Sequence, residues 1–146
     1  MMNDVDSVSI VFADDDEDDC FLFRRALTAV EIKNEINFMR DGMELIEFLN
    51  RNLKNSKGSS NPYLIVLDLN MPRLDGREAL AMIKNDPVLK KIPVVILTTS
   101  NNPEDVAKTY DLGASSFFTK PKDYPEFVRL FKALKEYWLQ LAVFPD

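Results

Sequence analysis

The chain has 146 residues, of which 46% are hydrophobic and 29% charged, with one cysteine and no histidine. This composition indicates one globular domain that can bury its own core, and it excludes a disordered chain. The net charge of −6 disfavours binding to nucleic acid or an anionic membrane, and the lack of histidine excludes His-based triads and phosphohistidine chemistry on this chain.

The first third of the chain alternates between apolar runs and amphipathic segments. Residues 9–13 (SIVFA) are almost continuously apolar, which predicts a strand buried on both faces. Asp16 is suited to cap a helix whose apolar residues recur at helical spacing over 21–30. Residues 35–39 (EINFM) predict a second strand, and 43–49 a second helix.

The middle of the chain begins with a polar segment over residues 50–62 that is rich in Ser, Asn and Lys. Because the alternation of elements resumes after it, we expect a long surface loop and not an interdomain linker. The apolar run 63–67 (YLIVL) predicts a third strand that leads directly into Asp68. A loop over 71–76 and a helix over 77–85 are expected next.

The last third continues the same alternation. Residues 93–97 (PVVIL) predict a fourth buried strand, and 103–112 a helix that begins with proline and ends at Gly113. A fifth strand is expected over 115–119 (SSFFT), and a final helix over 124–141. Five apolar strands that alternate with five helices predict an α/β fold, in which a parallel sheet is covered by helices on both faces.

Several features indicate a cytoplasmic protein. The single cysteine, Cys20, cannot form an internal disulfide, as expected in a reducing compartment. No apolar run approaches the roughly 20 residues of a membrane-spanning helix. Residues 1–9 are acidic and unlike a signal peptide.

Polar side chains directly follow four of the five predicted strands. They are Asp14, Asp15 and Asp16 after the first, Asp68 after the third, Thr98 after the fourth and Lys120 after the fifth. Ligand sites of open parallel sheets lie beyond the carboxyl ends of the strands, so we expect these side chains to converge. Carboxylates that converge in a desolvated cleft repel one another unless a divalent cation lies among them. Oxygen ligands without histidine or cysteine favour Mg²⁺ over zinc.

The acidic run continues past Asp16 with Glu17, Asp18 and Asp19. Acids are favourable in the first turn of a helix because they face the positive end of its dipole. We therefore expect these three residues to be solvated and to lie outside the site.

A carboxylate beside Mg²⁺, with a lysine and a hydroxyl opposite, suits phosphoryl transfer to that carboxylate. Asp68 is predicted to attack phosphorus and form an aspartyl phosphate. Lys120 and the cation would neutralise the phosphoryl oxygens, and the Thr98 hydroxyl would hold one of them.

The set of Asp14-Asp15, Asp68 with Leu-Asn-Met-Pro after it, Thr98, and Lys120-Pro121 resembles the signature of two-component receiver domains in order and spacing. The resemblance implies a flavodoxin-like three-layer sandwich with strand order 2-1-3-4-5. It covers about residues 8–141 and leaves 142–146 as a tail. We therefore expect residues 1–146 to form a single receiver domain without an output domain.

The resemblance also implies individual roles. Asp68 would be the phosphoacceptor. Asp15 would bind Mg²⁺ directly, Asp14 through water, and Asn70 through its main-chain carbonyl. The protein would be a response regulator that takes its phosphoryl group from a sensor histidine kinase and signals by changing shape and partners. It would catalyse only its own phosphorylation and dephosphorylation.

Thr98 and Phe117 would form the switch pair of such a domain, with the hydroxyl moving to the phosphoryl group and the ring following inward. Phe117 and Phe118 should face opposite sides of the sheet, and the resemblance implies a cis peptide bond before Pro121. Two departures stand out. Thr99 occupies a position where many receivers have alanine, and Phe117 replaces the common tyrosine.

More narrowly, the 50–62 loop, the string 92–100 (IPVVILTTS) and residues 137–139 resemble single-domain receivers that pair with bacterial and cyanobacterial phytochrome kinases. Three other functions stay open. A flavin-binding module would need a Ser/Thr/Gly-rich loop where this chain has acids. A Mg²⁺-dependent phosphohydrolase would usually have a second Asp at the position of Asn70. A receiver that is never phosphorylated is left open by Thr99.

The final helix extends its apolar stripe through Tyr137, Trp138 and Leu141. Exposed apolar surface of this kind usually meets a partner. We predict a two-fold symmetric homodimer through the fourth helix, fifth strand and fifth helix. The alternative is a monomer whose residues 142–146 fold back over the edge of the sheet.

Overall fold

The computed structural model describes residues 7–54 and 62–145. Its centre is a five-stranded sheet in which each pair of neighbouring strands is parallel. The strands are β1 (Ser9–Ala13), β2 (Ile36–Met39), β3 (Tyr63–Leu67), β4 (Val94–Thr98) and β5 (Ser116–Thr119). Their order is β2-β1-β3-β4-β5, which confirms the predicted flavodoxin-like topology.

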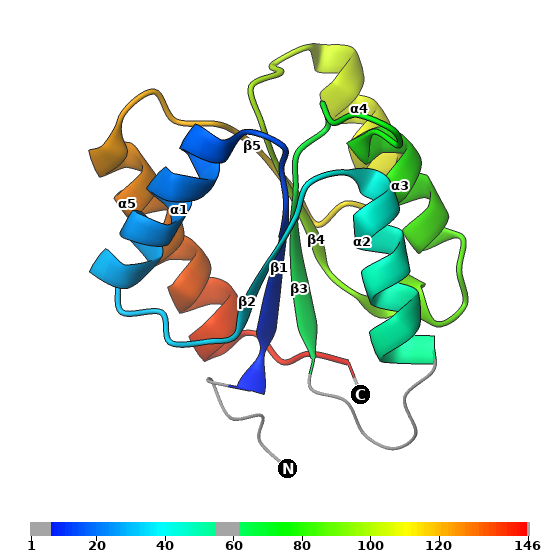
Figure 1. Cartoon of the computed structure of the whole chain (residues 1–146), viewed down its shortest axis with the longest axis horizontal. Coiled ribbons are helices and arrows are strands. Elements are labelled where there is room, and N and C mark those ends of the chain that lie inside the picture. Colours follow the sequence, from blue (N-terminus) through cyan, green and yellow to red (C-terminus); the bar gives the residue numbers. More distant parts are fainter. Residues whose placement is uncertain (1–6, 55–61, 146) are drawn as a thin grey trace.

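Five helices cover the two faces of the sheet in three layers (Figure 1). They are α1 (Glu17–Ala29), α2 (Gly42–Leu49), α3 (Gly76–Lys84), α4 (Pro103–Leu112) and α5 (Tyr124–Leu134). Helices α1 and α5 pack together on one face, and α2, α3 and α4 lie side by side on the other (Figure 1). No helix among the described residues is long and apolar enough to cross a membrane.

The core is divided by the sheet into two apolar clusters because successive strand residues point to opposite faces. In β1, Val11 packs beneath α2 and α3, whereas Phe12 packs beneath α1 and α5. The Phe12 ring centroid lies 5.4 Å from that of Phe23 and 5.8 Å from that of Phe131. Both faces of the central strands are therefore buried, which accounts for their continuous apolar sequence.

Most element boundaries agree with the sequence to within a residue. Asp16 caps α1 by accepting hydrogen bonds from two main-chain N–H groups, and Gly113 ends α4 with a left-handed φ of 111°. β4 extends one residue further than predicted because Thr98 pairs with Thr119 of β5. The peptide bond before Pro121 is trans, so the expected cis bond is wrong; the trans isomer is favoured before proline by about 0.5–1 kcal/mol.

The loop predicted over 50–62 is wrong at its start. Residues Asn50–Lys54 continue α2 as π-helical turns (η2). Leu53 packs on the core there, and the Asn52 side chain donates a hydrogen bond to the Phe48 carbonyl (2.8 Å). The remainder of that prediction, apart from Pro62, lies outside the described residues.

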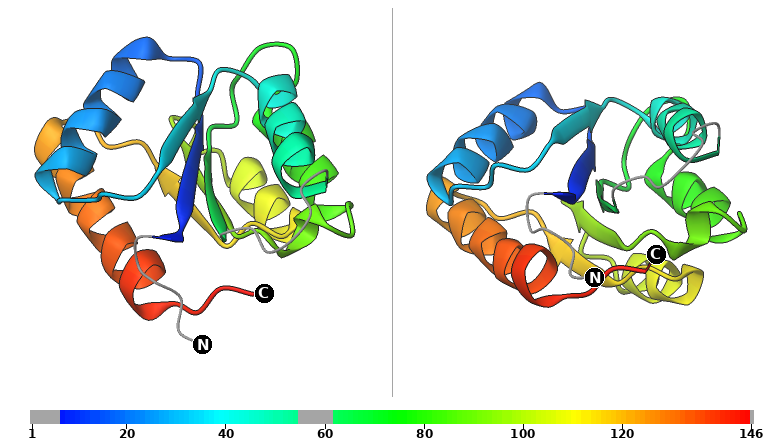
Figure 2. Two further views of the ribbon diagram at one scale, coloured as in Figure 1. Left: turned by 60° about the horizontal axis from the view of Figure 1, so that its bottom comes forward. Right: turned by 90° about the horizontal axis from the view of Figure 1, so that it is seen from below.

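The C-terminal segment folds back on the domain. After α5 the chain continues in π-helical turns over Lys135–Leu141 (η4), and the tail then runs beneath the amino-terminal ends of the strands (Figure 2). The Phe144 ring is 5% exposed and lies 5.8 Å from the Trp138 ring. Part of the apolar surface that the sequence suggested for a partner is thus covered by the chain itself.

Candidate functional site

The predicted site residues meet at the carboxyl ends of the strands, near the top of Figure 1. Sheet-type main-chain hydrogen bonds continue past the strand ends and fix the backbone there. The Asp68 N–H donates to the Ala13 carbonyl (2.9 Å), and the Lys120 N–H donates to the Thr98 carbonyl (2.7 Å). The parallel sheet therefore places these side chains on rigid backbone.

Asp68 lies at the centre of the cluster and is only 6% exposed. Its Oδ1 accepts hydrogen bonds from the Thr98 hydroxyl (2.7 Å) and the Asn70 main-chain N–H (3.2 Å). Its Oδ2 lies 2.9 Å from the Lys120 ammonium nitrogen. Both carboxylate oxygens are therefore held by donors, and the group is oriented before any ligand arrives.

Lys120 is the cation of this cluster, with its side chain 6% exposed. Its Nζ contacts Asp14 (2.8 Å), Asp68 (2.9 Å) and Asp19 (2.6 Å). Burial alone would lower the pKa of Lys120, but the three carboxylates outweigh burial and raise that pKa above its usual value. Lys120 is therefore charged at neutral pH.

The contact with Asp19 was not predicted, because the sequence indicated a solvated acid at the start of α1. Three acids follow one another in that first turn, and composition does not tell them apart. Only the packing of α1 beside the residues after β5 decides that Asp19 turns inward. The expectation is wrong for Asp19, whereas Glu17 and Asp18 are exposed as predicted.

Asp14 and Asp15 complete the acidic cluster. Carboxylate oxygens of Asp14, Asp15 and Asp68 all lie within 4.8 Å of one another. Asp14 is buried, and this burial raises its pKa to about 6 although Lys120 opposes the shift. Asp15 is exposed, and the Asp16 carboxylate caps the first turn of α1.

The charges in this cluster fit a divalent cation. The cluster holds four carboxylates, of which three contact the Lys120 ammonium and the fourth is that of Asp15, so negative charge is in excess in a mostly buried site. The ligand atoms are all hard oxygens, and Asp15 leaves one side of the cluster open to solvent. The main-chain N–H of Asn70 donates a hydrogen bond to Asp68, so the backbone of Asn70 lies next to the acidic cluster.

The two residues of the predicted switch pair, Thr98 and Phe117, lie on the neighbouring strands β4 and β5. Thr98 is fully buried with its hydroxyl on Asp68. Phe117 packs on the α2–α4 side of the sheet and Phe118 on the α1–α5 side, as the alternation predicted. The Phe117 N–H donates to the Tyr110 hydroxyl (3.1 Å), which links β5 to α4.

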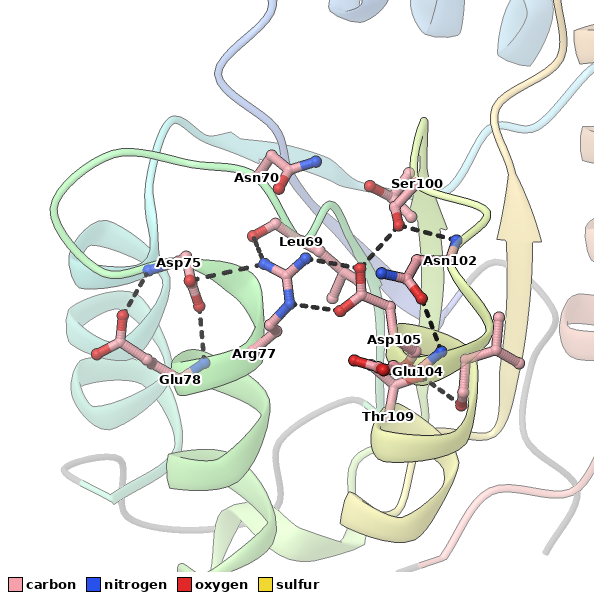
Figure 3. Close-up of polar contacts among 12 residues, drawn as sticks. Leu69, Asn70, Asp75, Arg77, Glu78, Ser100, Asn102, Glu104, Asp105 and Thr109 are labelled. Carbon is pink, nitrogen blue, oxygen red and sulfur yellow. Dashed lines mark hydrogen bonds and ion pairs between the residues drawn. The ribbon is translucent and has the colours of Figure 1, made fainter.

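A second polar network, which was not predicted, surrounds Arg77 and reaches Leu69, the residue that follows Asp68 (Figure 3). Arg77 of α3 donates two hydrogen bonds of 2.8 Å to the Asp105 carboxylate of α4, and Ser100 donates a third of 2.7 Å. Arg77 also reaches the Leu69 carbonyl at 3.5 Å. The Arg77 guanidinium, with help from Ser100, lowers the pKa of Asp105 to about 2, so the pair stays ionised except in strong acid.

This network ties α4 and the β4–α4 connection to the residue that follows Asp68. Arg77 and Asp105 lie 28 residues apart on different helices. A sequence pattern read along one helix at a time contains no signal for such a pair.

The chain is similar to proteins of known class. Residues 10–132 match the response regulator receiver domain family. The response regulator Rcp1 of Synechocystis is 37% identical over 136 residues, which cover 93% of this chain and 92% of Rcp1. The crystal structure of the Mn²⁺-bound form of Rcp1 has a TM-score of 0.82 at 35% identity, covering 94% of this chain and 99% of that one. The phosphorylated cyanobacterial phytochrome response regulator RcpA has a TM-score of 0.83 at 38% identity, covering 94% and 98%.

Proposed function

Because the chain belongs to the response regulator receiver domain family, we propose that it accepts a phosphoryl group on Asp68 from a sensor histidine kinase in the cytoplasm. The observation that carries the proposal is the buried Asp68 carboxylate, held between the Thr98 hydroxyl and the Lys120 ammonium. The protein catalyses only its own phosphorylation and dephosphorylation. It signals by a change of shape and of partners.

The chemistry follows from the groups around Asp68. A carboxylate oxygen of Asp68 forms a bond to phosphorus while the bond from phosphorus to the donor breaks, and the electron pair of that bond leaves with the donor. Lys120 faces the reacting carboxylate and neutralises charge on the phosphoryl oxygens. The Thr98 hydroxyl donates to Asp68 in this structure, and it would donate to one of those oxygens once Asp68 carries the phosphoryl group.

We assign Mg²⁺ to the carboxylates of Asp14, Asp15 and Asp68 and to the main-chain carbonyl of Asn70. The acidic cluster supports this assignment, as does the Mn²⁺-bound form of the relative Rcp1. When bound, the cation supplies positive charge to the phosphoryl oxygens. The open, all-oxygen ligand set suits a hard cation that keeps part of its water.

Mg²⁺ should stabilise the fold without any phosphodonor. The expected gain is about 3 kcal/mol when the free cation is ~100-fold above its dissociation constant. Thermal unfolding with and without MgCl₂ measures it, and Asp15→Asn should remove most of the shift while leaving the metal-free protein intact because Asp15 is exposed. An unchanged melting temperature at millimolar Mg²⁺ would count against the cation site.

The stabilisation of the fold by Mg²⁺ should decrease as the pH is lowered. The pKa of Asp14 is raised from 3.8 to about 6, so between these values the metal-free folded state binds more protons than the unfolded state. Its stability therefore falls as pH rises through this window. Protons also compete with Mg²⁺ for Asp14, so the stabilisation by Mg²⁺ should be smaller at about pH 5 than at about pH 7. An equal or larger gain at the lower pH would contradict this role of Asp14.

The proposed function is tested by a small phosphodonor. Acetyl phosphate with Mg²⁺ should add one phosphoryl mass to the protein and release acetate, because the nucleophile and its charge partners are all on this chain. Asp68→Asn should abolish the reaction while keeping the Thr98 contact through the amide oxygen. Labelling of Asp68→Asn at the wild-type rate would refute the assignment, and it would favour a receiver that is not phosphorylated at this site.

We propose that the phosphoryl group is sensed by Thr98 and Phe117. Thr98 Oγ1 already lies 2.7 Å from Asp68, and Phe117 is half-buried on the adjacent strand β5. When the Thr98 hydroxyl follows the phosphoryl group, it leaves room for the Phe117 ring to move inward. The link from Phe117 to Tyr110 would carry this change to α4.

We propose a phytochrome-type sensor kinase as the phosphodonor, since RcpA is a phytochrome response regulator.

We also propose a homodimer through α4, β5 and α5. Tyr110 of α4, and Tyr137 and Leu141 beyond α5, are exposed aromatic or aliphatic side chains on this side of the domain. A hollow lined by Phe118, Tyr137 and Trp138 lies between β5 and the end of α5. A patch that meets its own copy gives two-fold symmetry.

The dimer should be seen by sedimentation at roughly tens of micromolar protein. Tyr137→Ser combined with Leu141→Ser should yield monomers, because these side chains are 60% and 70% exposed and contribute apolar area only when a partner covers them. Val88→Ser, at a side chain 48% exposed outside α4, β5 and α5, is the matched control. A monomeric wild type with and without phosphodonor would sink the dimer proposal.

A further inference from the structure

Lys120 is held by three carboxylates that come from different parts of the fold. An ammonium group has three N–H donors, and Asp14, Asp19 and Asp68 each lie within 2.9 Å of it. The shortest contact, 2.6 Å, is to Asp19. Asp14 and Asp68 follow strands, whereas Asp19 belongs to the first turn of α1. Lys120 is thus anchored from the helix layer as well as from the sheet.

The three contacts differ in what happens to them during the proposed reaction. Asp14 and Asp68 share the cluster that fits a divalent cation, and Asp68 is itself the acceptor. Both change their charge environment when cation or phosphoryl group arrives. Among the described residues, the cation cluster is formed by Asp14, Asp15 and Asp68 without Asp19. Asp19 is therefore the partner of Lys120 whose own chemistry stays constant.

We infer that Asp19 is a positioning residue, which holds the Lys120 ammonium beside Asp68 when cation and phosphoryl group take over the other carboxylates. This inference rests on the proposed function and deepens it. A lysine side chain has four rotatable bonds, and a fixed anchor restricts where its charge lies during transfer. With Lys120 only 6% exposed, a displaced ammonium would find few other partners in this site.

The first consequence concerns the cation. Lys120 competes with a cation for the oxygens of Asp14 and Asp68, and Asp19 draws the ammonium toward α1. Without the Asp19 charge, the ammonium group would interact more strongly with Asp14 and Asp68. The negative potential at the cation site would also be weaker. Asp19→Asn should therefore raise the dissociation constant for Mg²⁺ about three- to tenfold, as expected for the loss of one nearby charge in a partly solvated site.

The second consequence concerns transfer. At saturating Mg²⁺, Asp19→Asn should slow labelling by acetyl phosphate about tenfold. This is less than the hundredfold or larger loss typical when a donor to a developing negative charge is deleted outright, because Lys120 is still present. Asp19→Glu should recover part of the rate, since it restores the charge on a slightly longer stem.

A purely structural role for Asp19 has to be separated from this one. An acid in the first turn also stabilises α1 through the helix dipole. Asp18 provides the matched control, because it is the neighbouring residue in the same turn, carries the same charge and is exposed. Asp18→Asn removes the same dipole interaction without a contact to Lys120.

The experiment measures two quantities on the full chain: the Mg²⁺ dissociation constant from thermal unfolding, and the initial rate of labelling by acetyl phosphate at saturating Mg²⁺. The variants are Asp19→Asn, Asp19→Glu, Asp18→Asn, Lys120→Met, and Lys120→Met combined with Asp19→Asn. We expect Asp19→Asn to bind Mg²⁺ more weakly and to be labelled more slowly, and Asp18→Asn to keep the wild-type affinity and rate. Adding Asp19→Asn to Lys120→Met should cause no further loss of labelling rate.

Equal rates and equal Mg²⁺ affinities for Asp19→Asn and Asp18→Asn would overturn the inference while leaving Asp68 as acceptor. A further tenfold loss in the Lys120→Met background would show that Asp19 acts independently of Lys120, and would overturn it too. A wild type that takes no phosphoryl group would instead refute the proposed function, and the inference with it.

Discussion

Replacing Lys120 by methionine is expected to destabilise the metal-free protein by about 3–5 kcal/mol, because it leaves three carboxylates clustered without their cation. This exceeds the roughly 1–2 kcal/mol expected for Thr98→Val, which removes one hydrogen bond to Asp68. Mg²⁺ should restore part of the lost stability, since it supplies charge to Asp14 and Asp68. Labelling of Asp68 should nevertheless stay slow.

Urea unfolding in EDTA and in MgCl₂ measures both effects. Lys122→Met is the matched control, because Lys122 is exposed two residues further along the chain. Lys120→Met should gain more free energy of unfolding from Mg²⁺ than the wild type does. Equal stability of Lys120→Met and wild type in EDTA would mean that Lys120 does not balance the charge of this cluster.

Gly76→Ala is expected to destabilise the protein by about 3 kcal/mol, although alanine normally stabilises a helix relative to glycine. A Cβ at position 76 would lie 2.1 Å from the Asp68 carbonyl oxygen and 2.7 Å from the Leu69 Cα. Both are backbone atoms, so the β3–α3 connection itself would have to shift. Because this connection positions Asp68, phosphoryl transfer should slow at least about tenfold as well.

Gly113→Ala is the control that separates the loss of stability in Gly76→Ala from its loss of phosphoryl-transfer rate. Gly113 has a φ of 111°, so alanine there is strained, but the residue ends α4 far along the chain from Asp68. It should lower the melting temperature while leaving the initial rate of labelling unchanged. If Gly76→Ala also kept the wild-type rate, the close approach at Gly76 would matter for packing alone.

Much of this architecture could be predicted from local patterns. Runs such as 63–67 are apolar throughout because both faces of the sheet are covered, and the residue after each run falls at one edge of the sheet. That geometry brings Asp14, Asp68 and Lys120 together without any knowledge of helix packing. The parallel sheet and the core of the site therefore followed from the strands, whereas the strand order was implied by the resemblance to receiver domains.

What could not be predicted depends on how helices pack. Asp19 faces Lys120 because of the way α1 lies beside the end of β5, and Arg77 meets Asp105 across two helices. Residues 50–54 are polar enough to indicate a loop, yet Leu53 packs on the core there. These are contacts between elements, which a pattern within one element does not contain.

The central claim, that Asp68 is the phosphoacceptor, is tested most directly by trapping the acyl phosphate. Hydroxylamine converts an aspartyl phosphate into a stable hydroxamate, and trypsin should then release residues 58–73, a peptide in which Asp68 is the only carboxylate side chain. After treatment with acetyl phosphate and Mg²⁺, we predict the hydroxamate on this peptide and its absence in Asp68→Asn. A hydroxamate on the peptide that carries Asp14 and Asp15, or a hydroxylamine-resistant phosphate on serine or tyrosine, would contradict the account.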